Sequence, residues 1–241
     1  MKKIIFLLVI LGLFFTSCER YNNSNNHNDD YDYNDDDNDD DTTNCDFVNF
    51  YYCDGRQIPI GELSNDYIVI GIDTTYSDGQ IQNFISTVNQ LDQNYDYTIH
   101  KLGLYKFKEI PVKLNSSKSC EEITQIIADL EQNAIVAYVH YAMQTDNCSS
   151  PFMELMGNLC INSYSTSFLV NVFDKNNLTS LNQMIAQTNT ELVTQNEFMP
   201  DWFELRATKN SKGDGLKMAN FFHESGLFAH SEPEISKYPV E

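Results

Sequence analysis

Histidine and cysteine are the residues of this sequence whose types could build a catalytic or metal site. The five histidines are scattered, and no nucleophile elbow, P-loop or dinucleotide-binding fingerprint accompanies them. The sequence also contains no Cys-x-x-Cys pair and no His-Glu-x-x-His helix, which are common zinc-binding patterns. We therefore predict a protein that is not an enzyme and that uses no cofactor or metal.

The first cysteine, Cys18, follows a segment with the features of an export signal. Residues 1–17 hold two lysines and then an apolar run over residues 4–15, which is too short to span a membrane. The small residues before Cys18 resemble a bacterial lipobox, in which the peptide is cut before a cysteine that is then lipidated. The alternative is a plain signal peptide followed by an ordinary cysteine. We predict a signal peptide over residues 1–17, lipidation of Cys18, and a lipid-anchored protein of the cell envelope, at the outer membrane or cell surface.

Five cysteines remain once Cys18 is assigned to the lipid. Disulfides are permitted in an exported protein. The pairings between near neighbours are Cys45 with Cys53 and Cys148 with Cys160, which leaves Cys120 without a partner near the start of a predicted helix. The sequence Ser119-Cys120-Glu121-Glu122 is a capping box, which predicts that the helix starts there.

Residues 18–46 form an acidic segment without a core. Residues 19–46 carry eleven acidic side chains against one arginine, and apolar residues are nearly absent. We expect a disordered tether, because such a composition cannot offset the entropy cost of ordering. A calcium site is the alternative, since Asp35, Asp37 and Asp39 alternate, but the loop glycine and the distal glutamate of a calcium hand are missing.

Net charge argues against a nucleic-acid partner. The formal charge of the chain is −20, and residues 47–241 alone hold 12 basic against 24 acidic side chains. A phosphate-binding face needs a basic patch. We therefore predict no nucleic-acid binding.

The pattern of elements predicts an α+β protein. Phe198 to Ile235 reads as strand, turn, helix and strand, and a shift of 92 residues aligns its helix end and last strand with residues 129–143. Residues 47–145 and residues 164–241 each fit the order β-α-β-β-α-β. We predict two tandem ferredoxin-like domains over residues 47–145 and 164–241, with antiparallel sheets and helices on one face, a linker over residues 146–163, and a β-hairpin around Asp54-Gly55 at the start of the first domain.

The second unit resembles the inhibitory propeptide of subtilisin-like serine proteases. That propeptide is a ferredoxin-like domain whose last strand ends near a Val-x-x-x-Glu-Pro-Asp sequence, and LFAHSEPE at Leu227 to Glu234 is similar to it. The segments KNSKGDGLKMANFFHESGLFAHSEPE and YYCDGRQIPI are closer still to the N-terminal regions of surface subtilases of Bacteroidetes. The resemblance covers residues 47–235.

Because the chain stops at Glu241 without a catalytic domain, the resemblance implies a protease inhibitor or folding assistant that acts on a separate protease, or a remnant with no activity. In the family, acidic residues between the middle strands cap two helices of the enzyme, and the C-terminal tail enters the substrate cleft. The residues that match these roles are Glu197 and Asp201 in the loop, Glu232 and Glu234 in the Glu-Pro-Glu sequence, and Tyr238 in the tail from Ser236 to Glu241.

The competing hypothesis is a lipid-anchored surface module that binds a glycan, a peptide or an envelope protein. The 14 tyrosines could supply its contacts, although most of them fall in predicted strands.

Overall fold

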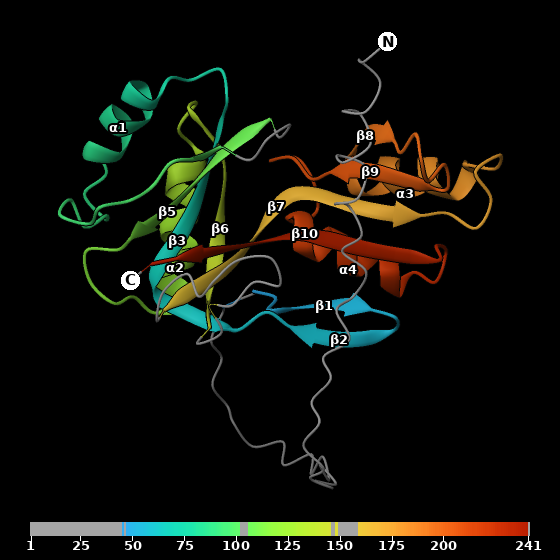
Figure 1. Cartoon of the computed structure of the whole chain (residues 1–241), viewed down its shortest axis with the longest axis horizontal. Coiled ribbons are helices and arrows are strands. Elements are labelled where there is room, and N and C mark those ends of the chain that lie inside the picture. Colours follow the sequence, from blue (N-terminus) through green and yellow to red (C-terminus); the bar gives the residue numbers. More distant parts are fainter. Residues whose placement is uncertain (1–44, 46, 102–105, 146–147, 149–158, 241) are drawn as a thin grey trace, which may run out of the picture. The chain divides into compact units, whose positions relative to one another are not determined.

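The computed structural model describes residues 45, 47–101, 106–145, 148 and 159–240, which form a mixed α+β fold with antiparallel sheets and four helices (Figure 1). Residues 1–44 lie outside the described part. The predicted signal peptide, the lipidation site Cys18 and most of the acidic tether fall in that region.

The chain enters the described part through the predicted β-hairpin, which the structure confirms. Strand β1 (Phe50–Cys53) pairs antiparallel with β2 (Arg56–Pro59). The turn between them places Asp54 at φ 49° and Gly55 at φ 74°, so both residues adopt the left-handed conformation that tight hairpin turns use.

The elements from β3 to β6 are referred to below as the first half. Its sheet has the strand order β4-β5-β3-β6. The elements are β3 (Glu62–Asp73), α1 (Asp78–Ser86), β4 (His100–Lys101), β5 (Phe107–Lys113), α2 (Cys120–Glu131) and β6 (Val136–Thr145). Helix α2 begins at the predicted capping box, in which Ser119 Oγ accepts the Glu122 N–H and the Glu122 side chain accepts the Ser119 N–H.

The first half has its apolar core on the face that α1 and α2 cover. Alternate side chains of β3 and β5 point to this face and contact the buried side of each helix. The core includes Ile68, Ile70, Ile72, Ile81, Ile85, Ile110, Val112, Ile123, Ile126 and Leu130.

The elements from β7 to β10 are referred to as the second half, and its strand order is β8-β9-β7-β10. The elements are β7 (Cys160–Asn171), α3 (Thr179–Thr188), β8 (Glu191–Gln195), β9 (Trp202–Arg206), α4 (Gly215–Glu224) and β10 (His230–Pro239). Its core again lies between one sheet face and the two helices, and it includes Phe168, Val170, Leu181, Met184, Phe203, Leu205 and Phe222.

Strand pairing joins the two halves into one sheet. Strands β6 and β7 pair from Met143 with Asn162 to Thr145 with Cys160. Residues 160–163, which we expected in a linker, therefore belong to β7. Strands β7 and β10 lie side by side and extend from the second half toward the first (Figure 1).

The C-terminal segment is a strand and not the free tail that the family resemblance implied. Residues 236–239 pair with β7, and the Val240 N–H donates a 3.0 Å bond to the Leu159 carbonyl. Tyr238 and Val240 are buried in a small core with Tyr67, Val69, Ala142 and Ile161. The segment is ordered because β7 is long enough to pair with it along its whole length, and because the first half buries its side chains.

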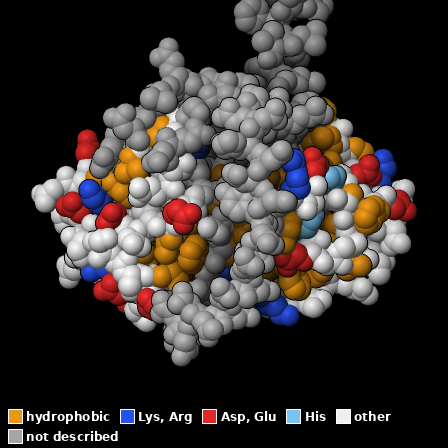
Figure 2. Space-filling view, turned by 90° about the horizontal axis from the view of Figure 1, so that it is seen from below, with side chains coloured by type: hydrophobic (Ala, Val, Ile, Leu, Met, Phe, Trp, Pro, Cys, Tyr) orange, Lys and Arg blue, Asp and Glu red, His pale blue; other side chains and the backbone are white. Residues whose placement is uncertain are grey.

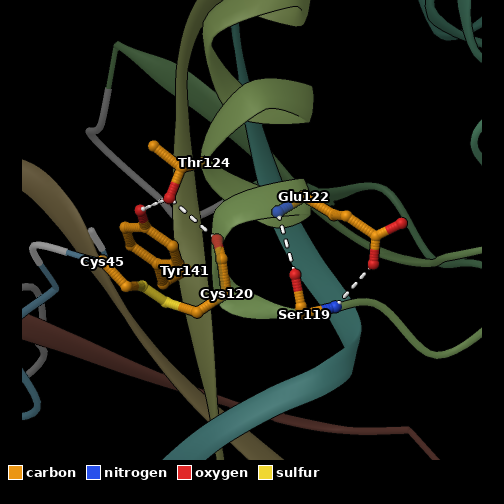
Figure 3. Close-up of a disulfide and its surroundings, with 6 residues drawn as sticks. All are labelled: Cys45, Ser119, Cys120, Glu122, Thr124 and Tyr141. Atoms are coloured by element: carbon orange, nitrogen blue, oxygen red, sulfur yellow. Dashed lines mark hydrogen bonds between the residues drawn. A yellow bond between two sulfur atoms is a disulfide. The ribbon is translucent and has the colours of Figure 1, made fainter. Parts of the chain in front are cut away.

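The disulfides correct one of the two predicted pairings. Cys148 pairs with Cys160 as expected, with 5.4 Å between their Cα atoms. Cys45, however, pairs with Cys120 across 5.8 Å and not with Cys53 (Figure 3). The reason lies in the packing of the entering chain, since the Phe47 ring lies 5.9 Å from that of Tyr141, beside the first turn of α2.

Candidate protein-docking site

The loop over residues 196–201, between β8 and β9, presents an aromatic side chain to solvent. Phe198 is 78% exposed, the highest value among the large hydrophobic side chains of the described residues. Glu197, next to it, is also exposed. A phenylalanine that exposed is not part of a core, so its neighbourhood is a candidate contact surface.

Hydrogen bonds within the loop fix its conformation. The Asn196 side-chain oxygen accepts the N–H groups of Phe198 and Met199, each at 2.9 Å. Gln195 Nε2 donates to the Pro200 carbonyl at 2.6 Å, and the Asn196 N–H donates to the Trp202 carbonyl at 2.9 Å. Phe198 is therefore exposed on an ordered loop, which lowers the entropy cost of binding through it.

Two further aromatic residues lie at the same end of the sheet. Phe173, just after β7, is 72% exposed. It lies near the loop because the Val172 N–H donates to the Asp201 carbonyl at 2.8 Å. Trp202 pairs with Asn171, the last residue of β7. We call Phe173, Glu197, Phe198, Asp201 and Trp202 the aromatic end.

Trp202 points to the face of the sheet that the helices leave free. Its neighbours in β9, Phe203 and Leu205, lie in the core under α3 and α4, and successive side chains of a strand alternate between faces. On the free face the Trp202 ring stacks on that of His230 from β10, with 6.0 Å between ring centres.

The surroundings of the aromatic end are acidic. Residues 173–206 contain five acidic side chains and two basic ones, Lys175 and Arg206. Figure 2 shows one face of the molecule, on which hydrophobic side chains reach the surface among acidic and basic ones. An excess of acidic side chains at a surface favours association with basic groups over acidic ones.

The structure separates the five residues that the resemblance singled out. Glu197 and Asp201 come together in the loop, as expected. Glu232 and Glu234 lie in β10, where Glu232 is opposite Leu169 and Glu234 accepts a 2.8 Å bond from Ser165 Oγ. Burial raises the pKa of Glu232, with His230 acting in the opposite direction.

Tyr238 lies at the far end of β10, against the first half. It is 3% exposed, and its hydroxyl donates to the carboxylate of Glu109, which is itself 2% exposed. Tyr138 donates to the other oxygen of Glu109 at 2.7 Å, and the His100 ring lies 4.5 Å from that of Tyr238. This buried position is not compatible with insertion of Tyr238 into a partner's pocket.

A cleft of about 250 Å³ lies between β6 and the loop that precedes α4. Several of its polar residues form hydrogen bonds with one another or with neighbouring residues of the two halves. Lys209 Nζ donates to the Glu131 carbonyl, Asp214 accepts from the Tyr164 hydroxyl at 3.1 Å, and His140 Nδ1 bonds the Tyr164 carbonyl at 2.6 Å. We interpret the cleft as part of the packing contact between the two halves.

Sequence reasoning missed Phe173, Phe198 and Glu109. The two phenylalanines stand outside any periodic apolar pattern and close to turn-forming residues, Asp174 and Asn196, which was a usable signal. Glu109 gave no such signal, because its tyrosine partners come from distant strands.

Among the described residues, no group of three or more histidine, cysteine, aspartate or glutamate side chains could hold a metal ion. No helix in this part of the chain is long and apolar enough to cross a membrane.

No family model matches this chain, and no curated protein matches it significantly. Among solved structures, it is similar to the small subunit of acetolactate synthase from Thermotoga maritima. That match has 8% sequence identity and a TM-score of 0.27, and it covers 72% of this chain and 95% of the other. A TM-score this low supports no inference about fold or function.

Proposed function

We propose that this chain is a protein-binding module of the cell envelope whose second half docks a partner through the aromatic end. The observation that carries the proposal is the loop over residues 196–201, which is held by its own hydrogen bonds and still exposes Phe198. Rigid aromatic side chains often contribute much of the binding energy of a protein interface, because their burial removes a large apolar area from water at a small cost in side-chain entropy.

A subtilisin-like serine protease is the first partner class to test, as a target of inhibition or of folding assistance. Two features support it. The sequence around LFAHSEPE resembles the propeptides of that family, and the loop that carries Glu197 and Asp201 joins the two middle strands of the β-α-β-β-α-β order, where the family has its helix-capping acids. Each exposed carboxylate at a helix N-terminus contributes about 0.3–1 kcal/mol.

The finer fold that goes with this proposal is a pair of tandem ferredoxin-like domains. Strand orders β4-β5-β3-β6 and β8-β9-β7-β10 are equivalent when each half is numbered from its own first strand. Strands β3 and β7 both have 12 residues, and β6 and β10 both have 10. In each half the two helices share one core with the sheet.

The buried C-terminal strand limits how such a protease could be inhibited. Because residues 236–239 pair with β7, a substrate-like tail is not part of the proposal. Docking would instead depend on the loop and on the edge of the second half.

We further propose that the protein is held at the membrane by lipid on Cys18, with the acidic segment as tether. The support is the apolar run and the small residues before Cys18. We expect Cys18→Ala to move the protein from the membrane to the soluble fraction, since multiple acyl chains give firm attachment. If the variant and the wild type distribute equally between the membrane and soluble fractions, the lipid anchor is wrong.

The test of the main proposal is titration of the purified protein against subtilisin-like proteases of the same organism. We expect inhibition or improved refolding of one of them. Phe198→Ala combined with Phe173→Ala should weaken the effect by at least about tenfold. Glu197→Gln should weaken it by less than about sixfold.

Phe221→Ala is the matched control, because Phe221 is an exposed phenylalanine on α4, away from the aromatic end. If no protease responds at micromolar concentration, the protease is excluded as partner. Equal losses in Phe221→Ala and Phe198→Ala would exclude the aromatic end as the docking surface.

A further inference from the structure

Strand β8 is the outer strand of the second half, and its residues are exposed. In the strand order of the described residues it pairs only with β9, and all five of its positions are exposed to solvent. Leu192 is 46% exposed, and Val193 next to it is also exposed. An apolar edge strand is a template for pairing with another chain.

The pairing of β9 shows which main-chain groups of β8 point outward. The residues that flank β9, Asp201 and Ala207, bond the chain of β7. The Val172 N–H, just after β7, donates to the Asp201 carbonyl, and the Ala207 N–H donates to the Thr166 carbonyl. In an antiparallel ladder every second residue bonds the same neighbour, so Phe203 and Leu205 also bond β7.

It follows that the residues of β8 opposite Phe203 and Leu205 do not bond β9 through their main chain. These residues are Gln195 and Leu192. The Asn196 N–H, in contrast, donates to the Trp202 carbonyl, as the alternation requires. Gln195 and Leu192 therefore present their N–H and carbonyl groups at the open edge, on either side of the bulge at Val193. The Gln195 carbonyl also accepts a 3.2 Å bond from Thr194 Oγ1.

Features that commonly protect an edge are sparse in β8. Its sequence, Glu-Leu-Val-Thr-Gln, contains no lysine and no proline, and the bulge is the main irregularity. Residues 173–206 carry five acidic and two basic side chains, and one of the basic ones, Arg206, lies opposite Glu191 of β8. A second copy of this chain would bring like charges together, whereas a basic segment would find complementary charge.

We propose that β8 binds an extended, basic segment of a partner protein as an added strand. The main-chain groups of Leu192 and Gln195 would supply the hydrogen bonds, and the acids near them would select lysine or arginine. This inference deepens the proposed function, because it rests on protein docking by the second half, and it names the kind of segment that is docked.

The test uses a fluorescent ten-residue peptide of alternating lysine and valine, with a glutamate-valine peptide as its counterpart. We expect anisotropy titrations to show binding of the lysine peptide only, weakened by salt. Gln195→Pro removes the outward N–H, and proline is tolerated on the open side of an edge strand. It should weaken binding by about fivefold relative to Gln195→Ala, which loses the same side chain but keeps the N–H.

Leu192→Pro compared with Leu192→Ala gives a second measurement at the other outward residue, in case one proline variant fails to fold. If the folded proline variants bind as tightly as their alanine counterparts, strand addition is wrong. Equal binding of the glutamate peptide would exclude the proposal that the bound segment is basic. Peptide binding without any protease response would leave this inference intact and exclude only the protease, so the two failures are distinguishable.

Discussion

Tyr238 donates a hydrogen bond from its hydroxyl to the buried carboxylate of Glu109, a residue 129 positions earlier in the chain. Tyr138 donates to the other carboxylate oxygen, and burial, with help from Glu109, raises its pKa well above 10, so it remains a donor. The last strand is thus attached to the first half by a hydrogen bond between two buried side chains.

Removing this hydroxyl is the first prediction. Tyr238→Phe keeps the ring and leaves the carboxylate with one donor fewer. We expect the free energy of unfolding to fall by about 1.5–3 kcal/mol, the range for hydrogen bonds to charged groups. Urea denaturation measures the change.

Tyr52→Phe is the control for that substitution, because Tyr52 also donates to a carboxylate, that of Glu224, but at an exposed position. It should cost less than about 1 kcal/mol. Similar losses of unfolding free energy in both variants would mean that the Glu109 carboxylate does not accept hydrogen bonds from two buried tyrosine hydroxyls.

Deletion of residues 236–241 tests the assignment of the C-terminal segment to β10. The deletion removes the pairing of residues 236–239 with β7 and the buried side chains of Tyr238 and Val240. Since each such side chain stabilises by about 1.5–3 kcal/mol when buried, we expect a loss of at least about 3 kcal/mol in denaturation experiments. Ile235→Ala, at an exposed position, should have little effect. A deletion variant as stable as the wild type would show that the segment is a free tail and not part of β10.

Local signals predicted much of this fold, and long-range contacts account for most of what they missed. The capping box at Ser119 and the turn at Asp54-Gly55 depend on neighbours a few residues away, so both were predicted correctly. The start of β7 was missed because Cys-Ile-Asn-Ser-Tyr-Ser-Thr is rich in small polar residues, which are typical of loops. These residues are buried because the chain pairs with both β6 and β10 there.

The candidate site was predictable in the same uneven way. The loop with Glu197 and Asp201 was placed correctly between two strands, because turn residues and strand composition are local. The position of Tyr238 was not, because it depends on Glu109 and on the pairing of β10 with β7, and no short-range pattern encodes either contact.

His100 gives a prediction about pH. Burial lowers its pKa, and Glu109 only partly offsets this. As pH falls below about 6.5, the unfolded chain gains a proton on His100 that the folded chain does not, so the free energy of unfolding should decrease. His100→Phe keeps a ring against Tyr238 and removes this effect.

The measurement is the difference in unfolding free energy between wild type and His100→Phe at pH values from 7.5 to 5. The wild type should lose stability relative to the variant across this range. A difference that is constant with pH would show that His100 titrates equally in the folded and unfolded chain.

The pairing of Cys45 with Cys120 gives the last prediction. This bond closes a loop of 75 residues, and loss of so long a closure costs about 4–5 kcal/mol in the chain-entropy account. Cys45→Ala and Cys120→Ala each break the same bond, so the double variant should be about as stable as either single variant. Cys45→Ala and Cys53→Ala, in contrast, should have additive effects, because the partner of Cys45 is Cys120 and not Cys53. Denaturation of the three single and two double variants measures this, and non-additivity of Cys45 with Cys53 would favour the local pairing instead.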